Sequence, residues 1–143
     1  MSYHKAVQAY QKKTDENLSP LQIVVELYKG MIKNTKDAKR HWQNGHLDLM
    51  TDSITKVFNI IEALQAHLDM EQGGEDAVFL NRFYNVIFSA LSRATSKPEP
   101  GEEFDSIVAY IQQVTDKWYA IAYDRPADNT APEMSSAQSV GAV

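Results

Sequence analysis

Four stretches of the chain repeat apolar residues at alternating three- and four-residue steps, which is the period of an amphipathic α-helix. No alternating pattern typical of a β-strand competes with them. The chain's only Gly-Gly pair, Gly73-Gly74, separates the second stretch from the third. Helices with one apolar face must bury that face against one another, so the sequence predicts an all-α fold. The predicted helices cover about 19–44, 48–71, 75–95 and 102–123.

Signals for helix ends support these boundaries. Ser19 suits an N-cap, Pro20 suits the first helical position, and Gln22 can complete a capping box. Gly45 is free to take the left-handed conformation that ends a helix. Asp48 is a plausible cap for the second helix.

The remaining breaks set the topology. Gly73-Gly74 is expected to end the second helix, and Glu75 then favours the start of the third through the helix dipole. Two prolines and a glycine make 96–101 a loop. Four helices joined by short links pack most simply as an antiparallel up-down-up-down four-helix bundle.

Both ends of the chain differ in composition from the predicted bundle, 18–124. Residues 1–17 are polar, with Tyr3, Val7 and Tyr10 on one side if the segment is helical, and we expect a flexible N-terminal arm or short helix. Residues 125–143 are rich in Ala, Ser, Pro and Gly, so we expect a disordered tail.

Composition excludes several classes of protein. There is no cysteine, so there is no disulfide framework or thiolate nucleophile. The formal net charge is −5, and the lysines of the first predicted helix are interspersed with acids, which is typical of a solvated face rather than a nucleic-acid surface. No apolar run approaches the ~18 residues of a membrane span, so we expect a cytoplasmic protein without direct membrane insertion.

Residues for catalysis, cofactors or metals do not cluster in the sequence. The scattered histidines lack the Glu-x-x-His spacing of a di-iron bundle, so no metal site is predicted. A histidine phosphotransfer domain is a remote alternative, with His67 as the only histidine well inside a predicted helix. Asp69 and Glu71 follow it closely and would repel a phosphoryl group. We therefore predict no enzyme activity.

Apolar residues exceed what a bundle core requires. A core-facing helix needs about three apolar positions per heptad, yet large side chains also flank the seams of all four helices. Together they could line grooves between neighbouring helices that accept an amphipathic partner helix. A merely generous core is the alternative interpretation.

A set of motifs adds a family resemblance over about residues 1–123. The run LDMEQGGE at 68–75, followed by Leu80 and Tyr84, resembles the centre of the flagellar export chaperone family FliS. The start Met-Ser-Tyr, the pair Tyr10-Gln11, the pattern Ser19-Pro20 with Leu27-Tyr28 and Gly30, and Trp118 are similar to other parts of that family in the same order.

The resemblance implies a cytoplasmic chaperone that covers the C-terminal segment of flagellin before export and is delivered to the export gate, with other flagellar regulators as further partners. A helical adaptor for a non-flagellar partner helix is the alternative. Tyr3, Val7 and Tyr10 are expected to occupy part of a groove and yield to the client. The candidate groove residues on the helices are Ile23, Leu27, Tyr28, Phe58, Ile60, Phe88 and Tyr119.

Overall fold

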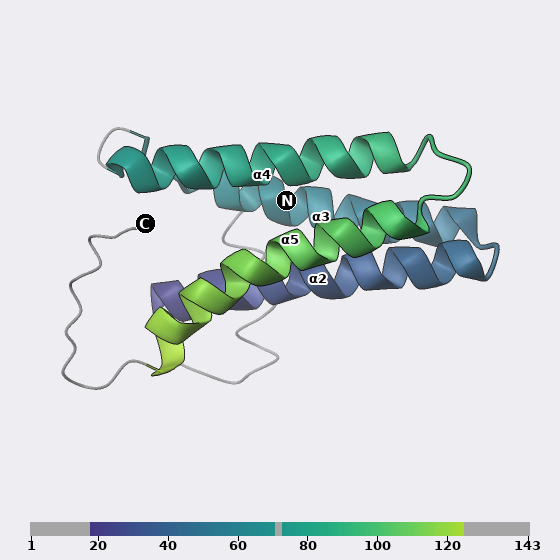
Figure 1. Ribbon diagram of the computed structural model, residues 1–143. Coiled ribbons are helices and arrows are strands. Elements are labelled where there is room, and N and C mark those ends of the chain that lie inside the picture. The colour runs from purple at the N-terminus through teal and green to yellow at the C-terminus, as the bar shows by residue number, and fades with distance from the viewer. Residues whose placement is uncertain (1–17, 71–72, 125–143) are drawn as a thin grey trace.

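The computed structural model describes residues 18–70 and 73–124, and these two ranges form four α-helices and a short π-helix without any strand. Figure 1 shows the helices packed side by side. The predicted all-α fold is confirmed. The elements are α2 (Pro20–Gln43), α3 (Leu47–Ala66), α4 (Gly74–Ala94), α5 (Gly101–Tyr119) and the π-helix η1 (Ala120–Asp124).

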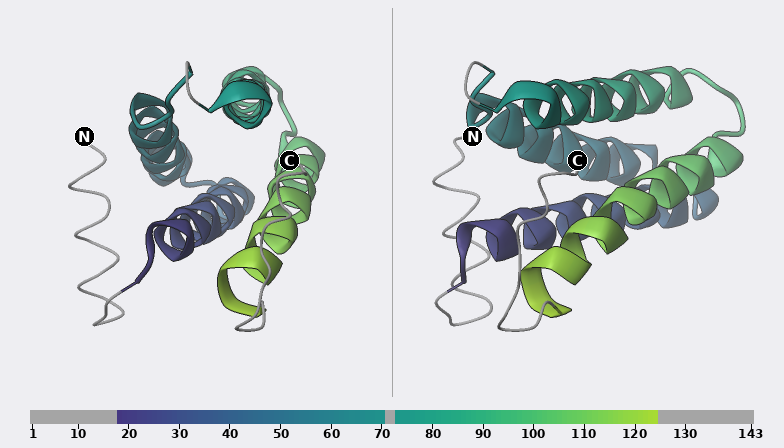
Figure 2. Two further views of the ribbon diagram at one scale, coloured as in Figure 1. Left: turned by 90° about the vertical axis from the view of Figure 1, so that its left-hand side faces the viewer. Right: turned by 60° about the vertical axis from the view of Figure 1, so that its left-hand side comes forward.

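Successive helices run in opposite directions, as expected for an up-down-up-down bundle (Figure 1). The end-on view in Figure 2 shows them arranged around a common centre. Helix α2 packs closely against both α3 and α5, and α4 completes the bundle between α3 and α5. Because α2 has a neighbour on each side, apolar residues on both of its flanks become buried.

The start of α2 has the predicted capping box. The Ser19 hydroxyl accepts a hydrogen bond from the Gln22 backbone N–H at 3.2 Å, and the Ser19 N–H donates to the Gln22 side chain at 3.0 Å. Pro20 occupies the first turn, where its missing N–H costs nothing. After the helix, Gly45 has a φ of 79°, which confirms the predicted left-handed turn.

Helix α3 differs from the prediction at both ends. It begins at Leu47 with His46 as the N-cap residue and no side-chain cap, so the prediction of an Asp48 cap is wrong. The His46 N–H donates to the His41 carbonyl at 2.8 Å, so the turn is tight and the new helix starts at once. Asp48 instead lies in the first turn, where the helix dipole favours its charge.

The second helix also ends earlier than expected, at Ala66 rather than at 71. The Gly73 N–H donates to the Asp69 carbonyl at 2.7 Å. A Cβ atom at Gly73 would lie 2.6 Å from that oxygen, so the close approach requires glycine. Gly73 is therefore the N-cap of α4 and not the end of α3, which has already ended at Ala66.

The core runs through the centre of the bundle and is built from aliphatic and aromatic side chains of all four helices. Two buried threonines do not leave polar atoms unsatisfied. Thr35 donates to the Met31 carbonyl at 2.8 Å, and Thr115 donates to the Ile111 carbonyl at 2.7 Å. The core is therefore continuous and apolar, and its side chains can form the floor of surface grooves.

Candidate functional site

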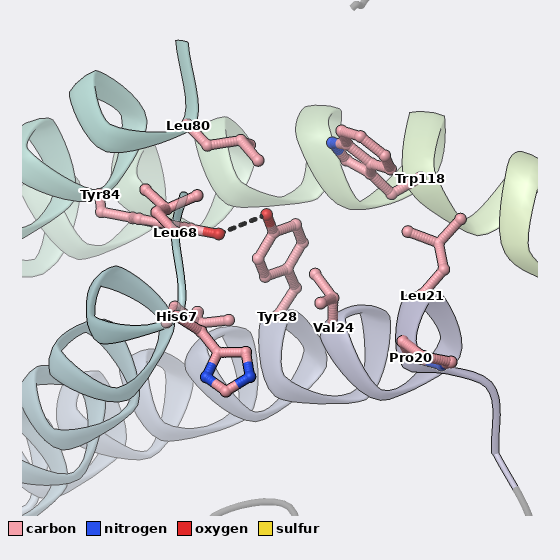
Figure 3. Close-up of a pocket in the computed structure, with 10 residues that line it drawn as sticks. Pro20, Leu21, Val24, Tyr28, His67, Leu68, Leu80, Tyr84 and Trp118 are labelled. Carbon is pink, nitrogen blue, oxygen red and sulfur yellow. Dashed lines mark hydrogen bonds between the residues drawn. The ribbon is translucent and has the colours of Figure 1, made fainter. Parts of the chain in front are cut away.

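An apolar pocket of about 360 Å³ opens at the end of the bundle where α2 begins and α5 ends (Figure 3). All four helices or their ends contribute to it, because α3 finishes and α4 starts at the same end. Pockets between the helices of a bundle are common places for ligands. The lining residues are Pro20, Leu21, Val24, Tyr28, Leu64, His67, Leu68, Leu80, Tyr84 and Trp118.

Two tyrosines form the polar part of this pocket. The hydroxyls of Tyr28 and Tyr84 are 2.8 Å apart and share a hydrogen bond between α2 and α4, drawn as the dashed line in Figure 3. Tyr28 is fully buried and Tyr84 is 2% exposed. Burial, together with the neighbouring Tyr84, raises the pKa of Tyr28 well above its ordinary value, so its hydroxyl stays neutral.

The walls of the pocket are half-buried apolar side chains. Leu21, Val24, Leu80 and Trp118 project toward one another from α2, α4 and α5 (Figure 3). Leu68 adds a fifth from the segment after α3 and packs on the core although it lies outside any helix. The half-buried walls leave apolar surface available to a ligand side chain.

His67 lies on the rim of this pocket as the C-cap residue of α3. The prediction that it lies well inside a helix is therefore wrong, because α3 ends at Ala66. The phosphotransfer alternative, which requires a mid-helix histidine, loses its structural basis. Across residues 18–70 and 73–124, no group of three or more histidine and acidic side chains could hold a metal ion.

A second groove of about 310 Å³ lies between α4 and α5 and shares Trp118 with the pocket. Phe79 stands on its α4 side, 45% exposed, and stacks on the buried Phe83 with ring centroids 6.3 Å apart. The Trp118 indole therefore borders both hollows, and we call the two together the apolar track around Trp118. The groove is lined by Phe79, Tyr110, Gln113, Val114, Lys117, Trp118 and Ile121.

A third groove of about 340 Å³ lies between α2 and α5 and contains Tyr119. The Lys29 ammonium lies 5.1 Å from the centre of the Tyr119 ring, within the range of a cation–π contact. Tyr119 also packs on Tyr123 of η1, with centroids 4.7 Å apart. Burial, followed by the nearby Glu26 carboxylate, raises the pKa of Tyr123 to about 12.

The structure does not bring the predicted groove residues of the helices together at one site. Ile23, Leu27 and Ile60 belong to the core, at 7%, 0% and 5% exposure. They were expected to line outer grooves, but neighbouring elements cover both flanks of their helices. Tyr28 is the exception, since its buried ring lines the pocket.

The other predicted residues lie apart from the pocket. Phe58 and Phe88 pack together across α3 and α4 with centroids 4.6 Å apart, and Phe88 is 47% exposed. Tyr119 lines the α2–α5 groove. Tyr3, Val7 and Tyr10 lie outside the described residues, as do the whole of the expected arm and the expected tail.

Sequence reasoning missed the pocket walls because it assigned them to the core. Leu21, Val24, Leu64, Leu68 and Trp118 all follow the helical seams. Periodicity shows which side of a helix is apolar, but it does not show where along the bundle the helices separate. The available signal was position, since each of these residues lies near a helix end.

No α-helix in the described parts of the chain is both long and apolar enough to cross a membrane.

Comparison with known proteins gives a consistent result. The family model for "Flagellar protein FliS" matches residues 3–125. The flagellar secretion chaperone FliS of Vibrio cholerae serotype O1 is 29% identical over 117 residues, which are 79% of this chain and 85% of that protein. The protein of the same name from Salmonella typhimurium is 25% identical over 105 residues, 73% of this chain and 77% of that protein. The chain belongs to the FliS family of flagellar secretion chaperones, a chaperone family rather than an enzyme family.

Proposed function

We propose that this protein binds the C-terminal segment of flagellin in the cytoplasm, prevents its premature polymerisation and takes part in its delivery to the flagellar export gate. The apolar track around Trp118 carries the proposal. It offers a pocket deep enough for side chains and a neighbouring groove long enough for a helix turn or more. Contact with other flagellar regulators belongs to the same proposal.

The pocket fits an apolar segment better than a polar ligand. Its walls are aliphatic and aromatic, and its two tyrosine hydroxyls are already bonded to each other. A ligand group that competes for the Tyr28 hydroxyl would have to break a buried hydrogen bond. Leucine-sized side chains would instead gain about 1.5–3 kcal/mol each on full burial.

Coupled folding sets how much contact the client needs. A disordered segment that folds on binding loses roughly 2–5 kcal/mol in ordering. Two or three buried side chains would little more than offset that cost. We therefore propose that the client uses both the pocket and the α4–α5 groove, with Trp118 contacted from both sides.

The predicted groove residues have separate roles in this proposal. Tyr28 supports the client from the base of the pocket, and the core residues Ile23, Leu27 and Ile60 hold the surrounding helices in place. The surface aromatics Phe58 and Tyr119 extend the client contact along the bundle, and Phe88 supports Phe58 from α4. Tyr3, Val7 and Tyr10 compete with the client, because their segment joins α2 beside the pocket.

A tryptophan pair provides the test. Trp118→Ala should weaken binding of a C-terminal flagellin peptide by about tenfold or more, as for truncation of a central interface aromatic. Trp42→Ala is the matched control, since Trp42 is also half-buried but lies near Gly101 at the opposite end of the bundle. Equal loss of affinity in both variants, measured by calorimetric titration, would place the client elsewhere.

The adaptor alternative requires a different client. Purified protein used as bait in the cytoplasm of motile cells should retain flagellin as its main partner. Trp118→Ala bait should lose that partner while Trp42→Ala bait keeps it. Retention of another helical protein in place of flagellin would favour the adaptor.

A further inference from the structure

The outward face of α4 has apolar side chains that the bundle does not use. Val78 and Val86 are 47% and 42% exposed, and Met70, from the corner before α4, is 47% exposed. They line a shallow surface groove of about 570 Å³. Leu80 and Tyr84 of the same helix point to the pocket on the inner side, so this groove is a separate surface.

Two arginines give the same face a positive charge. Arg82 and Arg93 line the groove, and neither forms an ion pair with any other described residue. From Ala77 to Ala94, α4 contains no aspartate or glutamate. This stretch is therefore locally cationic in a chain whose net charge is −5.

The polar groups between the arginines favour an acceptor-rich ligand. The Gln65 amide Nε2 donates to Asn81 Oδ1 at 3.1 Å and to Asn85 Oδ1 at 2.8 Å. Both asparagine oxygens are thus occupied by α3, while their Nδ2 groups have no acceptor among the described residues. The face presents amide and guanidinium donors, which are complementary to carboxylates.

We propose that this face of α4 docks an acidic amphipathic helix from a partner protein, at a site distinct from the one that takes flagellin. Arg82 and Arg93 are about 16 Å apart along the helix axis, and Val78 and Val86 about 12 Å. A partner helix of about four turns would match this spacing. Its apolar stripe would lie on the valines, and its carboxylates would meet the two arginines.

The spacing favours a protein segment over a phosphate-rich surface. Nucleic-acid backbones and anionic membranes are held by clustered basic residues. Here two arginines are separated by three turns, with an apolar groove between them. Binding measurements with anionic vesicles and with an acidic peptide therefore distinguish a phosphate-rich surface from a protein segment as the partner.

The probe is a synthetic amphipathic peptide of about 16 residues with leucines on one face and flanking glutamates. The control peptide replaces each glutamate with lysine. The acidic peptide should bind the full chain and perturb backbone amide resonances between Val78 and Arg93, and the basic peptide should not bind. Saturation with the flagellin peptide should leave the affinity for the acidic peptide unchanged. That result would show that the two peptides bind at different sites.

Variants test the charge and the apolar parts separately. Arg82→Gln with Arg93→Gln should weaken the acidic peptide by about tenfold, since each exposed ion pair accounts for a few-fold. Val86→Ser should weaken it while leaving its salt dependence unchanged. Lys36→Gln, which removes an exposed charge on α2 that forms no ion pair within the described residues, is the control and should have no effect.

Three results would overturn the proposal. The first is equal binding, or no binding, of the acidic and basic peptides. The second is displacement of the acidic peptide by the flagellin peptide. The third is binding of phosphatidylglycerol vesicles that depends on Arg82 and Arg93 while the acidic peptide fails to bind.

Discussion

The hydrogen bond between Tyr28 and Tyr84 joins α2 to α4 beneath the pocket and lends itself to a double-mutant cycle. Neither hydroxyl is reached by bulk water, since the residues are 0% and 2% exposed. Tyr28→Phe or Tyr84→Phe removes one partner and leaves the other hydroxyl buried without this bond. The loss of this neutral, buried hydrogen bond should cost about 1 kcal/mol in each single variant.

The double variant should cost less than the sum of the two single variants. In the double variant, phenyl rings fill the same space as the two tyrosines. Neither ring then has a hydroxyl that has lost its partner in this bond. We expect a coupling free energy of about 1 kcal/mol, measured by urea unfolding followed through tryptophan fluorescence. Strictly additive losses would show that the 2.8 Å contact contributes nothing to the stability of the bundle.

The same pair predicts a pH dependence on the alkaline side. The pKa of Tyr28 is raised above its ordinary value of 10.0 by burial, so the folded chain keeps this proton after the unfolded chain has lost it. The free energy of unfolding should therefore fall as the pH rises above about 10. Tyr28→Phe should reduce the slope of that fall, and an unchanged slope would contradict the reasoning.

Further variants test other parts of the fold, each by urea or thermal unfolding. Gly73→Ala should destabilise by about 1–3 kcal/mol, because its Cβ would lie 2.6 Å from the Asp69 carbonyl; a neutral effect would contradict the close approach. Ser19→Ala should cost about 1 kcal/mol through loss of the α2 cap, and no change would refute that role. The pKa of Asp37 is lowered from 3.8 because, although desolvation raises it, the bonds from a lysine and an arginine outweigh that effect. Asp37→Asn should then destabilise slightly at neutral pH, and the difference should vanish as the pH falls below that pKa.

Local sequence signals predicted much of the fold. The capping box at Ser19 and the left-handed Gly45 depend on residues a few positions apart, and both appear as expected. The end of α3 could not be predicted in the same way. At this end the backbone N–H groups of His67 and Leu68 donate to the carbonyls three residues earlier, Leu64 and Gln65, and no residue type at these positions signals that change.

The candidate site was harder to predict from the sequence than the fold. A helical wheel places Leu27 at the edge of the apolar seam, but α2 has neighbours on both sides and its edges are buried. Trp118 lies on a seam, yet it faces a pocket because the helices separate at this end of the bundle. The burial of Leu27 and the position of Trp118 at a pocket both depend on the distance between helices. The spacing of apolar residues along one helix does not determine that distance.

The heat-capacity change on binding a C-terminal flagellin peptide tests the proposed function most directly. Coupled folding onto an apolar track should bury roughly 1,000–3,000 Å². The corresponding heat-capacity change is about −0.2 to −0.5 kcal/mol/K, measured by calorimetric titration at several temperatures. We predict a value in that range with the natural chain and a smaller magnitude with Trp118→Ala. A value near zero, or no binding at tens of micromolar, would contradict the proposal.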